Sequence, residues 1–417
     1  MSSSLSFSKV IAGRMEKVSV ALISSSIGKT PQDIHYSFVF DEAYKLGERG
    51  LAVHVVRSFK EKTSFSNGIH FHGLESASRI KYTPFLFKHL TAIPNIAYLM
   101  PPWALLYLAK YGSAVTNVIN SQNIGLIHAH FAYPEGFVGL LAKRVTKKPL
   151  VVTVHGYDIL VEPSVGYGAR LSRRIDSIVR KVLNDADAVI AASKATFNEA
   201  RKLVKDRSKV HLIPNGVDIQ RFNPTLDGFK TRKTMGIEGH TVVFTLRAHE
   251  PKYGLEYLIR AVPMVAKEKN DVVFVIGGCG SLKHYHEQLA IKLGVQDKII
   301  FAGKIPQSES PFYYAMSDIV VIPSIQEAFG LGVTEAMACG KPTIGTNVGG
   351  IPDQIIDGYN GFVVEPRNAK EMAEKILWLI DNRDEAKRMG INGRKTVEEK
   401  YNLDERINQI LTLYKRV

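Results

Sequence analysis

The stretch that decides the fold is "DIVVIPSIQEAFGLGVTEAMACGKPTIGTN", residues 318–347. It opens with a short β-branched run, passes through a loop into a helix-like segment with two glycines near its start, and closes with a second strand-like run. A strand, a helix and a strand in this order predict a βαβ unit with two parallel strands. The same alternation recurs almost from end to end of the chain, so the sequence predicts an α/β fold.

Twelve buried parallel strands are expected, six in each half of the chain. They lie at residues 17–25, 51–58, 125–131, 149–156, 187–193 and 209–215, and at residues 241–247, 271–278, 298–304, 318–324, 342–347 and 361–365. Helix-like segments separate the strands of the first half, at residues 32–49, 103–120, 135–145 and 167–184. Because twelve strands exceed one comfortable sheet, we predict two Rossmann-like, doubly wound domains that face each other across a cleft, with ligands beyond the carboxyl ends of the strands.

The domain boundary is expected in a polar stretch, residues 218–230, which contains a proline and a glycine. We therefore predict an N-terminal domain at 1–220 and a C-terminal domain at 221–398. Residues 399–417 are predicted to form a final helix that could cross back to the N-terminal domain.

Composition is ordinary for a soluble globular protein, because 45% of the 417 residues are apolar and 23% are charged. The two cysteines, Cys279 and Cys339, are far apart and give neither a disulfide framework nor a metal-ligand spacing. The first twenty residues contain no apolar core of the length that a signal peptide needs. A reducing, cytoplasmic location is therefore expected.

A formal net charge of +14 indicates anionic partners. Basic residues cluster at 169–183 and 199–210, and the apolar spacing in the first cluster predicts a helix with its arginines on the solvent face. The aromatic stretch 85–112 is interrupted by prolines and charges, so it does not qualify as a membrane span. These features lead to the hypothesis of a peripheral site on an anionic membrane face. No nucleic-acid-binding motif is present, so a nucleic-acid partner is not expected.

The chemistry concentrates around two carboxylates, Glu327 and Glu335, that flank the start of the predicted helix. Glycines at this place let a ligand approach the backbone, and free amides at a helix start favour an anion such as a diphosphate. Two acids would repel that anion unless each binds neutral hydroxyls beside it, as the ribose and the hexose of a nucleotide sugar would provide. Arg247 and Lys252 follow a strand of the same domain and supply compensating charge.

At this point the sequence strongly resembles the retaining glycosyltransferases of family 4, which have the GT-B fold. The resemblance covers nearly the whole chain. It is strongest in "RAHEPKYGLEYLIRAV" (247–262), in "HLIPNGVDIQRF" (211–222) and in residues 301–355, and "VVTVHGYDI" (151–159) and "LIHAHF" (126–131) support it. The glutamate pair is specific when it occurs together with the arginine and the lysine.

The resemblance implies that the N-terminal domain (1–220) receives the acceptor and that the C-terminal domain (221–398) binds the nucleotide sugar. It also implies a role for each side chain of this set. Glu335 matches the glutamate that binds the ribose hydroxyls, and Glu327 matches the one that contacts the transferred sugar. Arg247 and Lys252 match the cationic pair that stabilises the departing diphosphate. His155, in "HGYD", matches a histidine of the first domain that faces the donor sugar across the cleft.

The remaining donor-binding positions implied by the resemblance are mainly backbone contacts. The turn that meets the sugar and the diphosphate matches Phe329, Gly330 and Leu331. The stretch that meets the base matches Lys304 and Ile305. The family usually shows a glycine pair in the first strand-to-helix loop. Here that loop, "SSSIGKTPQD" at 24–33, has only Gly28, which is assigned part of the same role.

The implied mechanism is retaining, with no protein nucleophile, no cofactor and no metal ion. Two motifs bear on the metal. "DAD", at 185–187, directly precedes a predicted strand and is interpreted as a helix-to-strand junction. His128 and His130 in "HAH" point to one face of a strand, but no third ligand is identifiable from the sequence, so packing is the favoured interpretation.

The function predicted from these observations is transfer of a hexose from a nucleotide-diphosphate sugar to a hydroxyl acceptor, which is lipid-linked or a polysaccharide. The alternatives are a nucleotide-sugar epimerase of the same architecture and a non-enzymatic protein that binds anions or membranes. A dinucleotide-dependent oxidoreductase is disfavoured, because the nearest glycine motif, at 277–283, comes late and lacks the last glycine.

Overall fold

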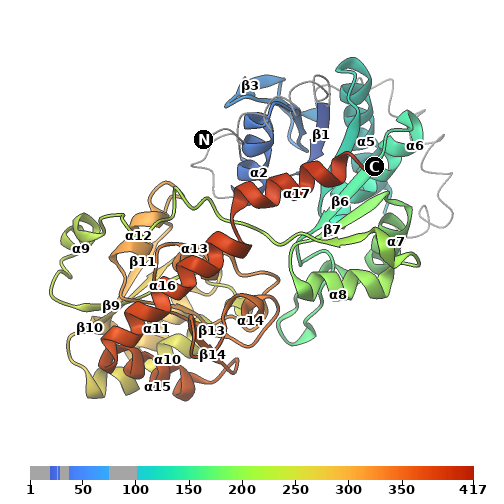
Figure 1. Ribbon diagram of the computed structural model, residues 1–417. Helices are drawn as coiled ribbons and strands as arrows, with labels where there is room; N and C mark the ends of the chain where they lie inside the picture. The colour runs from blue at the N-terminus through green and yellow to red at the C-terminus, as the bar shows by residue number, and fades with distance from the viewer. Residues whose placement is uncertain (1–18, 26, 29–36, 75–100) are drawn as a thin grey trace, which may run out of the picture.

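The computed structural model describes residues 19–25, 27–28, 37–74 and 101–417. Part of the aromatic stretch 85–112 and most of the loop 24–33 therefore lie outside the described residues. The chain forms two α/β domains, each with a parallel sheet between layers of helices (Figure 1). This confirms the predicted architecture.

The N-terminal sheet has eight strands in the order β3-β4-β2-β1-β5-β6-β7-β8, and all pair in parallel except β3, which runs antiparallel to β4. Their bounds are β1 (Ser19–Ile23), β2 (Ala52–Val56), β3 (Ser64–Ser66), β4 (Ile69–His72), β5 (Leu126–His130), β6 (Leu150–Val154), β7 (Ala188–Ala191) and β8 (Val210–Leu212). The sequence analysis missed β3 and β4. Their run is polar and rich in histidine, but Asn67 and Gly68, both at positive φ, form the turn between them.

Helices of the N-terminal domain follow the expected alternation. They are α2 (Ser37–Glu48), α5 (Pro102–Ser121), α6 (Phe137–Thr146), α7 (Arg173–Asp185) and α8 (Lys194–Leu203), with short turns η3 (Ala132–Gly136), η4 (Pro163–Val165), η5 (Ala169–Leu171) and η6 (Arg207–Lys209). The expectation that every arginine of 169–183 faces solvent is wrong for Arg170. It precedes α7, and its largely buried guanidinium donates to Asp176 and Glu199.

The C-terminal sheet has six parallel strands in the order β11-β10-β9-β12-β13-β14. They are β9 (Thr241–Leu246), β10 (Val272–Gly277), β11 (Ile299–Gly303), β12 (Ile319–Ile322), β13 (Thr343–Thr346) and β14 (Gly361–Val364). The helices and turns around them are α9 (Phe229–Met235), η7 (Pro251–Tyr253), α10 (Leu255–Glu268), α11 (Lys283–Lys292), η8 (Gln296–Lys298), α12 (Ser310–Met316), α13 (Leu331–Ala338), α14 (Ile351–Gln354), α15 (Ala369–Asp381) and α16 (Arg383–Lys400).

The chain passes between the domains twice, and the two passages lie side by side. Val217 donates to the carbonyl of Tyr401, and Leu403 donates to the carbonyl of Val217. After the second passage, α17 (Leu403–Tyr414) packs against α2 of the N-terminal domain (Figure 1). Ile407 and Ile410 of α17 are fully buried in the core that also contains residues of β1 and β2.

The carboxyl edges of the two sheets face each other. Gly156, which follows β6, lies so close to Ala328, which follows β12, that a Cβ on Gly156 would come within 2.3 Å of the Ala328 Cβ. Since ligands of doubly wound sheets bind beyond the carboxyl ends of the strands, this contact marks the edge of the candidate site.

Docking of α17 should contribute measurably to the stability of the N-terminal domain. Ile407→Ala deletes buried methyl groups and should lower the free energy of unfolding of this domain by about 2–5 kcal/mol. Gln409→Ala, on the exposed face of the same helix, is the matched control and should have little effect in the same urea titration. Equal unfolding midpoints for the two variants would show that α17 is not held as described.

Candidate functional site

Arg247 is the centre of the candidate site. It follows β9, and its Nη1 lies 3.2 Å from the Glu327 carboxylate, with both side chains largely buried. Its Nε and Nη2 are buried and have no hydrogen-bond partner among the described residues. A buried donor without a partner is costly, so these two nitrogens indicate a place for an oxygen-rich anion.

Lys252 brings a second positive charge to the same place without an ion pair among the described residues. Its Nζ lies 4.5 Å from the ring centroids of both Tyr167 and Tyr253. Tyr167 belongs to the N-terminal domain, so the ammonium group bridges the two domains through cation–π contacts. The backbone carbonyl of Lys252 also accepts from the amides of Ile325 and Gln326, which fixes the loop that carries Glu327.

The loop after β12 is shaped by close backbone packing. Gly349, at φ +55°, lies where a Cβ would come within 1.5 Å of the Glu327 carbonyl oxygen. A Cβ on Gly350 would come within 2.7 Å of the Ala328 carbonyl oxygen and 2.9 Å of the Phe329 Cα. Gly330, at φ +95°, begins α13. The amide of the buried Gln354 donates to the Phe329 carbonyl, while its oxygen accepts from Thr334 of α13.

Glu327 itself is held from several sides. Its carboxylate accepts from the Ala328 amide and from the Ser324 hydroxyl, in addition to its contact with Arg247. A carboxylate engaged in this way is oriented rather than free to attack. The predicted turn residues Phe329, Gly330 and Leu331 lie directly beyond it, at the start of α13.

A cavity of about 320 Å³ extends from Arg247 toward β11. Glu335 lies at one end, and its carboxylate accepts a 2.8 Å hydrogen bond from the Tyr314 hydroxyl. Burial raises the pKa of Glu335, against the opposing effects of Tyr314 and nearby arginines. Lys304 and Ile305, which follow β11, line the same cavity together with Leu246, Ala248, Gly278, Cys279, Gln307 and Ser310. The structure thus brings together the C-terminal residues that the sequence singled out.

His155 lies on the opposite side, at the end of β6. Its Nε2 is 3.0 Å from Nδ1 of the buried His130, and its Nδ1 has no hydrogen-bond partner among the described residues. The rings of Phe38 and Phe131 lie 4.9 and 4.7 Å from it. Since His155 directly precedes Gly156, it stands next to the contact with Ala328.

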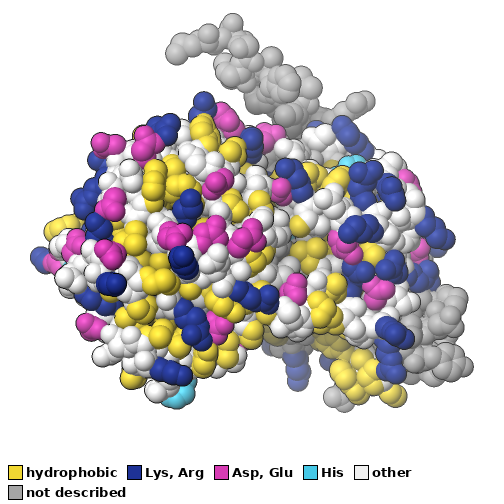
Figure 2. Space-filling view, turned by 90° about the horizontal axis from the view of Figure 1, so that it is seen from below, with side chains coloured by type: hydrophobic (Ala, Val, Ile, Leu, Met, Phe, Trp, Pro, Cys, Tyr) yellow, Lys and Arg dark blue, Asp and Glu magenta, His cyan; other side chains and the backbone are white. Residues whose placement is uncertain are grey.

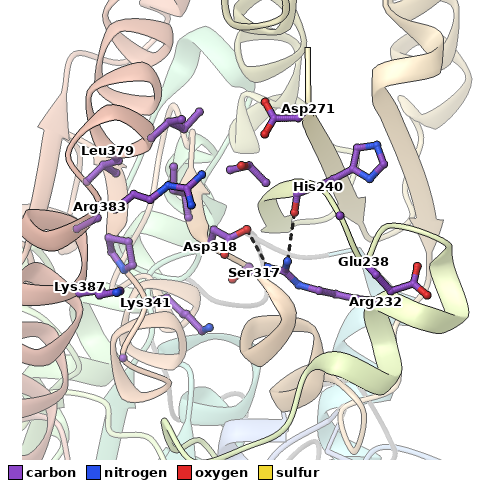
Figure 3. Close-up of a pocket in the computed structure, with 17 residues that line it drawn as sticks. Arg232, Glu238, His240, Asp271, Ser317, Asp318, Lys341, Leu379, Arg383 and Lys387 are labelled. Carbon is purple, nitrogen blue, oxygen red and sulfur yellow. Dashed lines mark hydrogen bonds and ion pairs between the residues drawn. The ribbon is translucent and has the colours of Figure 1, made fainter. Parts of the chain in front are cut away.

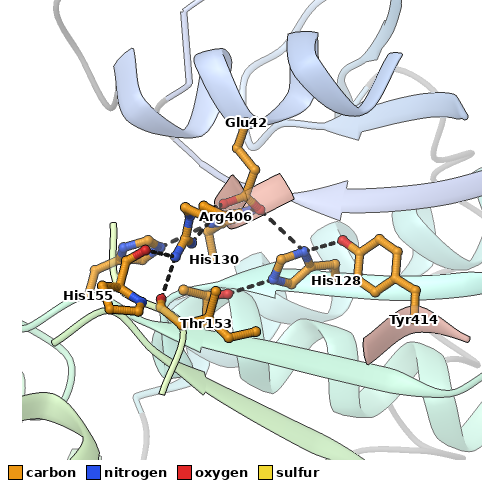
Figure 4. A network of polar contacts seen from close by, with 9 residues as sticks. Glu42, His128, His130, Thr153, His155, Arg406 and Tyr414 are labelled. Atoms are coloured by element: carbon orange, nitrogen blue, oxygen red, sulfur yellow. Dashed lines mark hydrogen bonds and ion pairs between the residues drawn. The ribbon is translucent and has the colours of Figure 1, made fainter. Parts of the chain in front are cut away.

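Glu42, His128 and His130 come close enough to be considered as metal ligands. The sequence did not identify Glu42 as a partner, because it lies on α2. However, Arg406 forms an ion pair with Glu42, and both nitrogens of His128 are hydrogen-bonded, to Tyr414 and to Thr153 (Figure 4). A neighbouring guanidinium and an engaged imidazole do not suit a divalent cation, so the cluster fits a hydrogen-bonded network better than a metal centre.

The other metal motif is also explained structurally. Asp185 ends α7, and Asp187 directly precedes β7. Asp185 is paired with Arg144 and Lys181, and Asp187 accepts from Lys143 and from the Leu150 amide. This is the junction that the sequence predicted.

Gly28 is buried in the loop after β1, and no contact between it and the residues above is seen within the described part of the chain. The same loop meets Glu135 of η3, whose Oε1 accepts from the amide and the hydroxyl of Ser25. Burial raises the pKa of Glu135 to about 7. Its Oε2 is buried without a partner among the described residues. Besides Nδ1 of His155, Oε2 of Glu135 is therefore a second buried polar atom of the N-terminal domain without a partner among the described residues.

A larger cavity, of about 460 Å³, lies at the opposite edge of the C-terminal sheet (Figure 3). Its charged groups are of both signs, and three of them are already engaged: Arg232 pairs with Asp318, and Lys341 donates to the Ala315 carbonyl. It lies beyond the amino ends of β9, β12 and β13 rather than their carboxyl ends, so it is not the candidate site.

Sequence reasoning missed Tyr167, Gly349, Gly350 and Gln354. The glycine pair in "NVGG" was a usable signal, because adjacent glycines often mark a close backbone approach. Tyr167 and Gln354 carried no local signal, since their roles depend on contacts between segments far apart in the chain.

Two family models match the chain. "Glycosyltransferase Family 4" matches residues 37–221, and "Glycosyl transferases group 1" matches residues 229–396. The matched segments correspond to the two α/β domains. Of the residues named above for the candidate site, only Ser25, Gly28, Arg406 and Tyr414 lie outside them.

Similar proteins span most of the chain. N-acetyl-alpha-D-glucosaminyl L-malate synthase of Bacillus anthracis is 27% identical over 380 residues, covering 89% of this chain and 90% of its own. A GDP-mannose-dependent alpha-(1-6)-phosphatidylinositol monomannoside mannosyltransferase of Mycolicibacterium smegmatis is 29% identical over 290 residues, covering 68% and 74%. The crystal structure of Anabaena Alr3699/HepE in complex with UDP and glucose aligns with a TM-score of 0.76 at 20% identity, covering 96% and 100% of the two chains.

The Gly349 contact gives a direct test of the site geometry. Gly349→Ala would force the Glu327 loop to move, and a misplacement of about 1 Å at such a site can cost on the order of 10²-fold in rate. We expect a comparable loss of affinity for a nucleoside diphosphate, measured by titration calorimetry. Gly358→Ala is the matched control, because Gly358 also has positive φ but has nothing within 4 Å of its added Cβ. Equal affinities in the two variants would contradict this account.

Proposed function

The chain belongs to glycosyltransferase family 4, with a C-terminal domain of the group 1 type, and we propose that it transfers a hexose from a nucleoside-diphosphate sugar to a hydroxyl acceptor with retention of configuration and without a metal ion. The observation that carries the proposal is the pair of unpartnered buried nitrogens on Arg247, next to Lys252 and between the two glutamates.

In the proposed reaction, two positively charged side chains face the departing diphosphate. Arg247 offers two fixed donors, and Lys252 offers a positive charge held only by aromatic rings. Preorganised donors aimed at developing charge supply a large part of the rate in many enzymes. In the proposed reaction these two cations do the work that a divalent cation does elsewhere, which supports the assignment of a metal-independent enzyme.

Donor orientation follows from the two carboxylates. Glu335, accepting from Tyr314 at the end of the cavity, is assigned to the ribose hydroxyls, and Glu327 to the hexose. Lys304 and Ile305 are assigned to the base, and the backbone at Phe329, Gly330 and Leu331 to the sugar and the diphosphate. Because Glu327 is already bound on several sides, it is proposed to position the hexose rather than attack it. Retention is proposed from the resemblance to the retaining family 4 enzymes. Because no dedicated nucleophile is assigned, we propose that the donor phosphate participates directly.

The similar proteins agree with this donor class. The Anabaena structure holds UDP and glucose, and the Mycolicibacterium relative is named for GDP-mannose and a phosphatidylinositol mannoside. We propose a nucleotide-sugar donor for this chain on this basis, with a sugar or a lipid-linked molecule as acceptor.

The cationic pair can be tested directly. Arg247→Ala and Lys252→Ala should each lower turnover by roughly 10²–10³-fold, because each removes a stabiliser of the leaving group. Arg260→Ala, an exposed arginine of the same domain, should remain near wild type, and all three variants should keep the wild-type fold, as checked by circular dichroism. Turnover is measured by mass spectrometry of products from a panel of nucleotide sugars and acceptors, with and without EDTA. Normal turnover of both site variants would refute the assignment.

The same assay separates the alternatives. An epimerase would convert the sugar with no acceptor present, whereas the proposed enzyme requires an acceptor and leaves the anomeric configuration of the hexose unchanged in the product, as determined by NMR. Inversion at the anomeric carbon, or loss of turnover in EDTA, would each overturn the corresponding part of the proposal.

A membrane-facing surface is the second part of the proposal. Trp103 and Leu106, near the start of α5, are 73% and 51% exposed. Arg173 and Arg174, at the start of α7, are also exposed, and Lys and Arg side chains are numerous on the N-terminal domain in Figure 2. Exposed apolar side chains and exposed basic side chains on one domain are features of proteins that bind an anionic bilayer surface. Among the described helices, none is long and apolar enough to cross a bilayer.

Flotation with vesicles containing phosphatidylglycerol tests this surface. At low salt the protein should float with anionic vesicles and remain in the soluble fraction with neutral ones. Arg173→Ala combined with Arg174→Ala should weaken flotation, because each basic residue near an anionic surface contributes about 1 kcal/mol. The matched control is Arg383→Ala combined with Lys387→Ala, which removes two basic residues from the C-terminal domain. Protein that stays soluble with anionic vesicles at low salt would refute peripheral binding.

A further inference from the structure

A continuous line of buried polar groups runs from the C-terminal helix to His155. Arg406 of α17 donates to Glu42 of α2, with both side chains almost fully buried. The other carboxylate oxygen of Glu42 lies 3.4 Å from Nε2 of His130, in a charge contact where neither atom makes a hydrogen bond among the described residues. Nδ1 of His130 in turn lies 3.0 Å from Nε2 of His155 (Figure 4).

The carboxylate of Glu42 decides which ring nitrogen of His130 carries the proton. A carboxylate that is paired with an arginine can only accept. A lone pair on Nε2 of His130 would be repelled by the carboxylate oxygen 3.4 Å away, so the proton of a neutral His130 belongs on Nε2. This leaves Nδ1 of His130 as an acceptor, so that His155 must carry its proton on Nε2 and donate it to His130.

Both imidazoles are neutral in this arrangement. Burial lowers the pKa of His130 to about 3, and burial together with His130 and Arg406 lowers the pKa of His155 well below its usual range. A neutral imidazole has one proton, so His155 cannot carry a second proton on Nδ1.

From this geometry we infer that Glu42 and His130 act as positioning residues that lock His155 in the Nε2–H tautomer, so that His155 presents the lone pair of Nδ1 to its ligand. The Nδ1 atom is buried and has no partner among the described residues. Its complement is a group that donates a hydrogen bond, such as a sugar hydroxyl, and not an oxyanion. This last step rests on the proposed function, because there the hydroxyl belongs to the donor sugar.

The position of His155 explains why a fixed tautomer would be useful. His155 ends β6 next to Gly156, which touches the loop carrying Glu327. Glu327 is also an acceptor. A sugar placed between them would meet acceptors on both sides, whereas Arg247 and Lys252 supply only donors and positive charge. The two sets of groups therefore separate hydroxyl recognition from diphosphate recognition.

The test is the tautomer of His155 in the full-length protein without substrate. Protein labelled with ¹⁵N-histidine is studied by two-bond ¹H–¹⁵N correlation at pH 7, which distinguishes a protonated Nδ1 from a protonated Nε2. His155→Gln identifies the signals of His155 by their loss. The inference requires protonated Nε2 and unprotonated Nδ1 for His155. A protonated Nδ1, whether in the other tautomer or in a charged imidazolium, would overturn it.

His130→Leu tests the positioning role. Without the acceptor at His130, the signals of His155 should show a population protonated at Nδ1. His286→Leu is the matched control, because it breaks a comparable histidine pair with His249, 2.9 Å apart, in the other domain. An unchanged His155 tautomer in His130→Leu would show that His130 does not set it. If this variant does not fold, the wild-type spectrum still decides the tautomer.

A kinetic experiment tests whether Nδ1 of His155 contacts a hydroxyl of the donor sugar. UDP-glucose and GDP-mannose are compared with analogues in which one sugar hydroxyl at a time is replaced by fluorine, which accepts but cannot donate a hydrogen bond. For one position, the wild type should lose roughly 10-fold more turnover than His155→Ala, since a single hydrogen bond is lost. Equal losses at every position would overturn the sugar contact. Because the spectra do not depend on turnover, failure of the proposed function alone would leave the tautomer result intact.

Discussion

The buried ion pair between Glu42 and Arg406 is the interaction on which the arrangement of the two domains depends. Burying two charges costs several kcal/mol per ion, which good geometry must offset. Here Arg406 also donates to the carbonyls of Ile213 and Pro214, in the first passage between the domains. One guanidinium thus holds α2, the first passage and α17 together. A pair of this kind adds little net stability over apolar packing, but it accepts only one register of the helix, because any shift would leave a charge buried and unpaired.

That register has consequences at the cleft. With both passages held side by side, the carboxyl edges of the two sheets meet, and Lys252 reaches the ring of Tyr167 in the other domain. The loops that carry the site are short, and they are fixed by backbone contacts such as that of Gly349 with Glu327. The polar groups of the site are therefore preorganised by packing that lies outside the site itself, which is the arrangement that electrostatic stabilisation requires.

Much of this architecture was predictable from local sequence, and the reason is physical. Buried parallel strands need continuous β-branched runs, so all twelve predicted strands were visible, whereas β3 and β4 were not, because they form a polar edge hairpin. The glutamates, Arg247 and Lys252 were recognisable because they share short segments with a fixed spacing. Tyr167, Gln354, Glu42 and Arg406 were not, because their partners are brought together only by the fold; Glu42 and Arg406 are separated by 364 positions. Arg170 was predicted to face solvent because the helical pattern was extended back to residue 169, whereas α7 begins only at Arg173.

The strongest argument about the site is the distribution of polar atoms that the protein itself leaves unsatisfied. Most buried polar groups in folded proteins have partners. Among the described residues, Arg247 leaves two donors without partners, and His155 on the facing domain leaves Nδ1, an acceptor in the inferred tautomer. Each such group costs about 1–3 kcal/mol, a cost that selection tolerates where a ligand removes it. The donors on Arg247 and the charge of Lys252 are complementary to an anion, and the acceptors on Glu327 and Glu335 are complementary to hydroxyls. A molecule with a central diphosphate and hydroxyls on both sides satisfies all of them, which neither a free phosphate nor a free sugar can do.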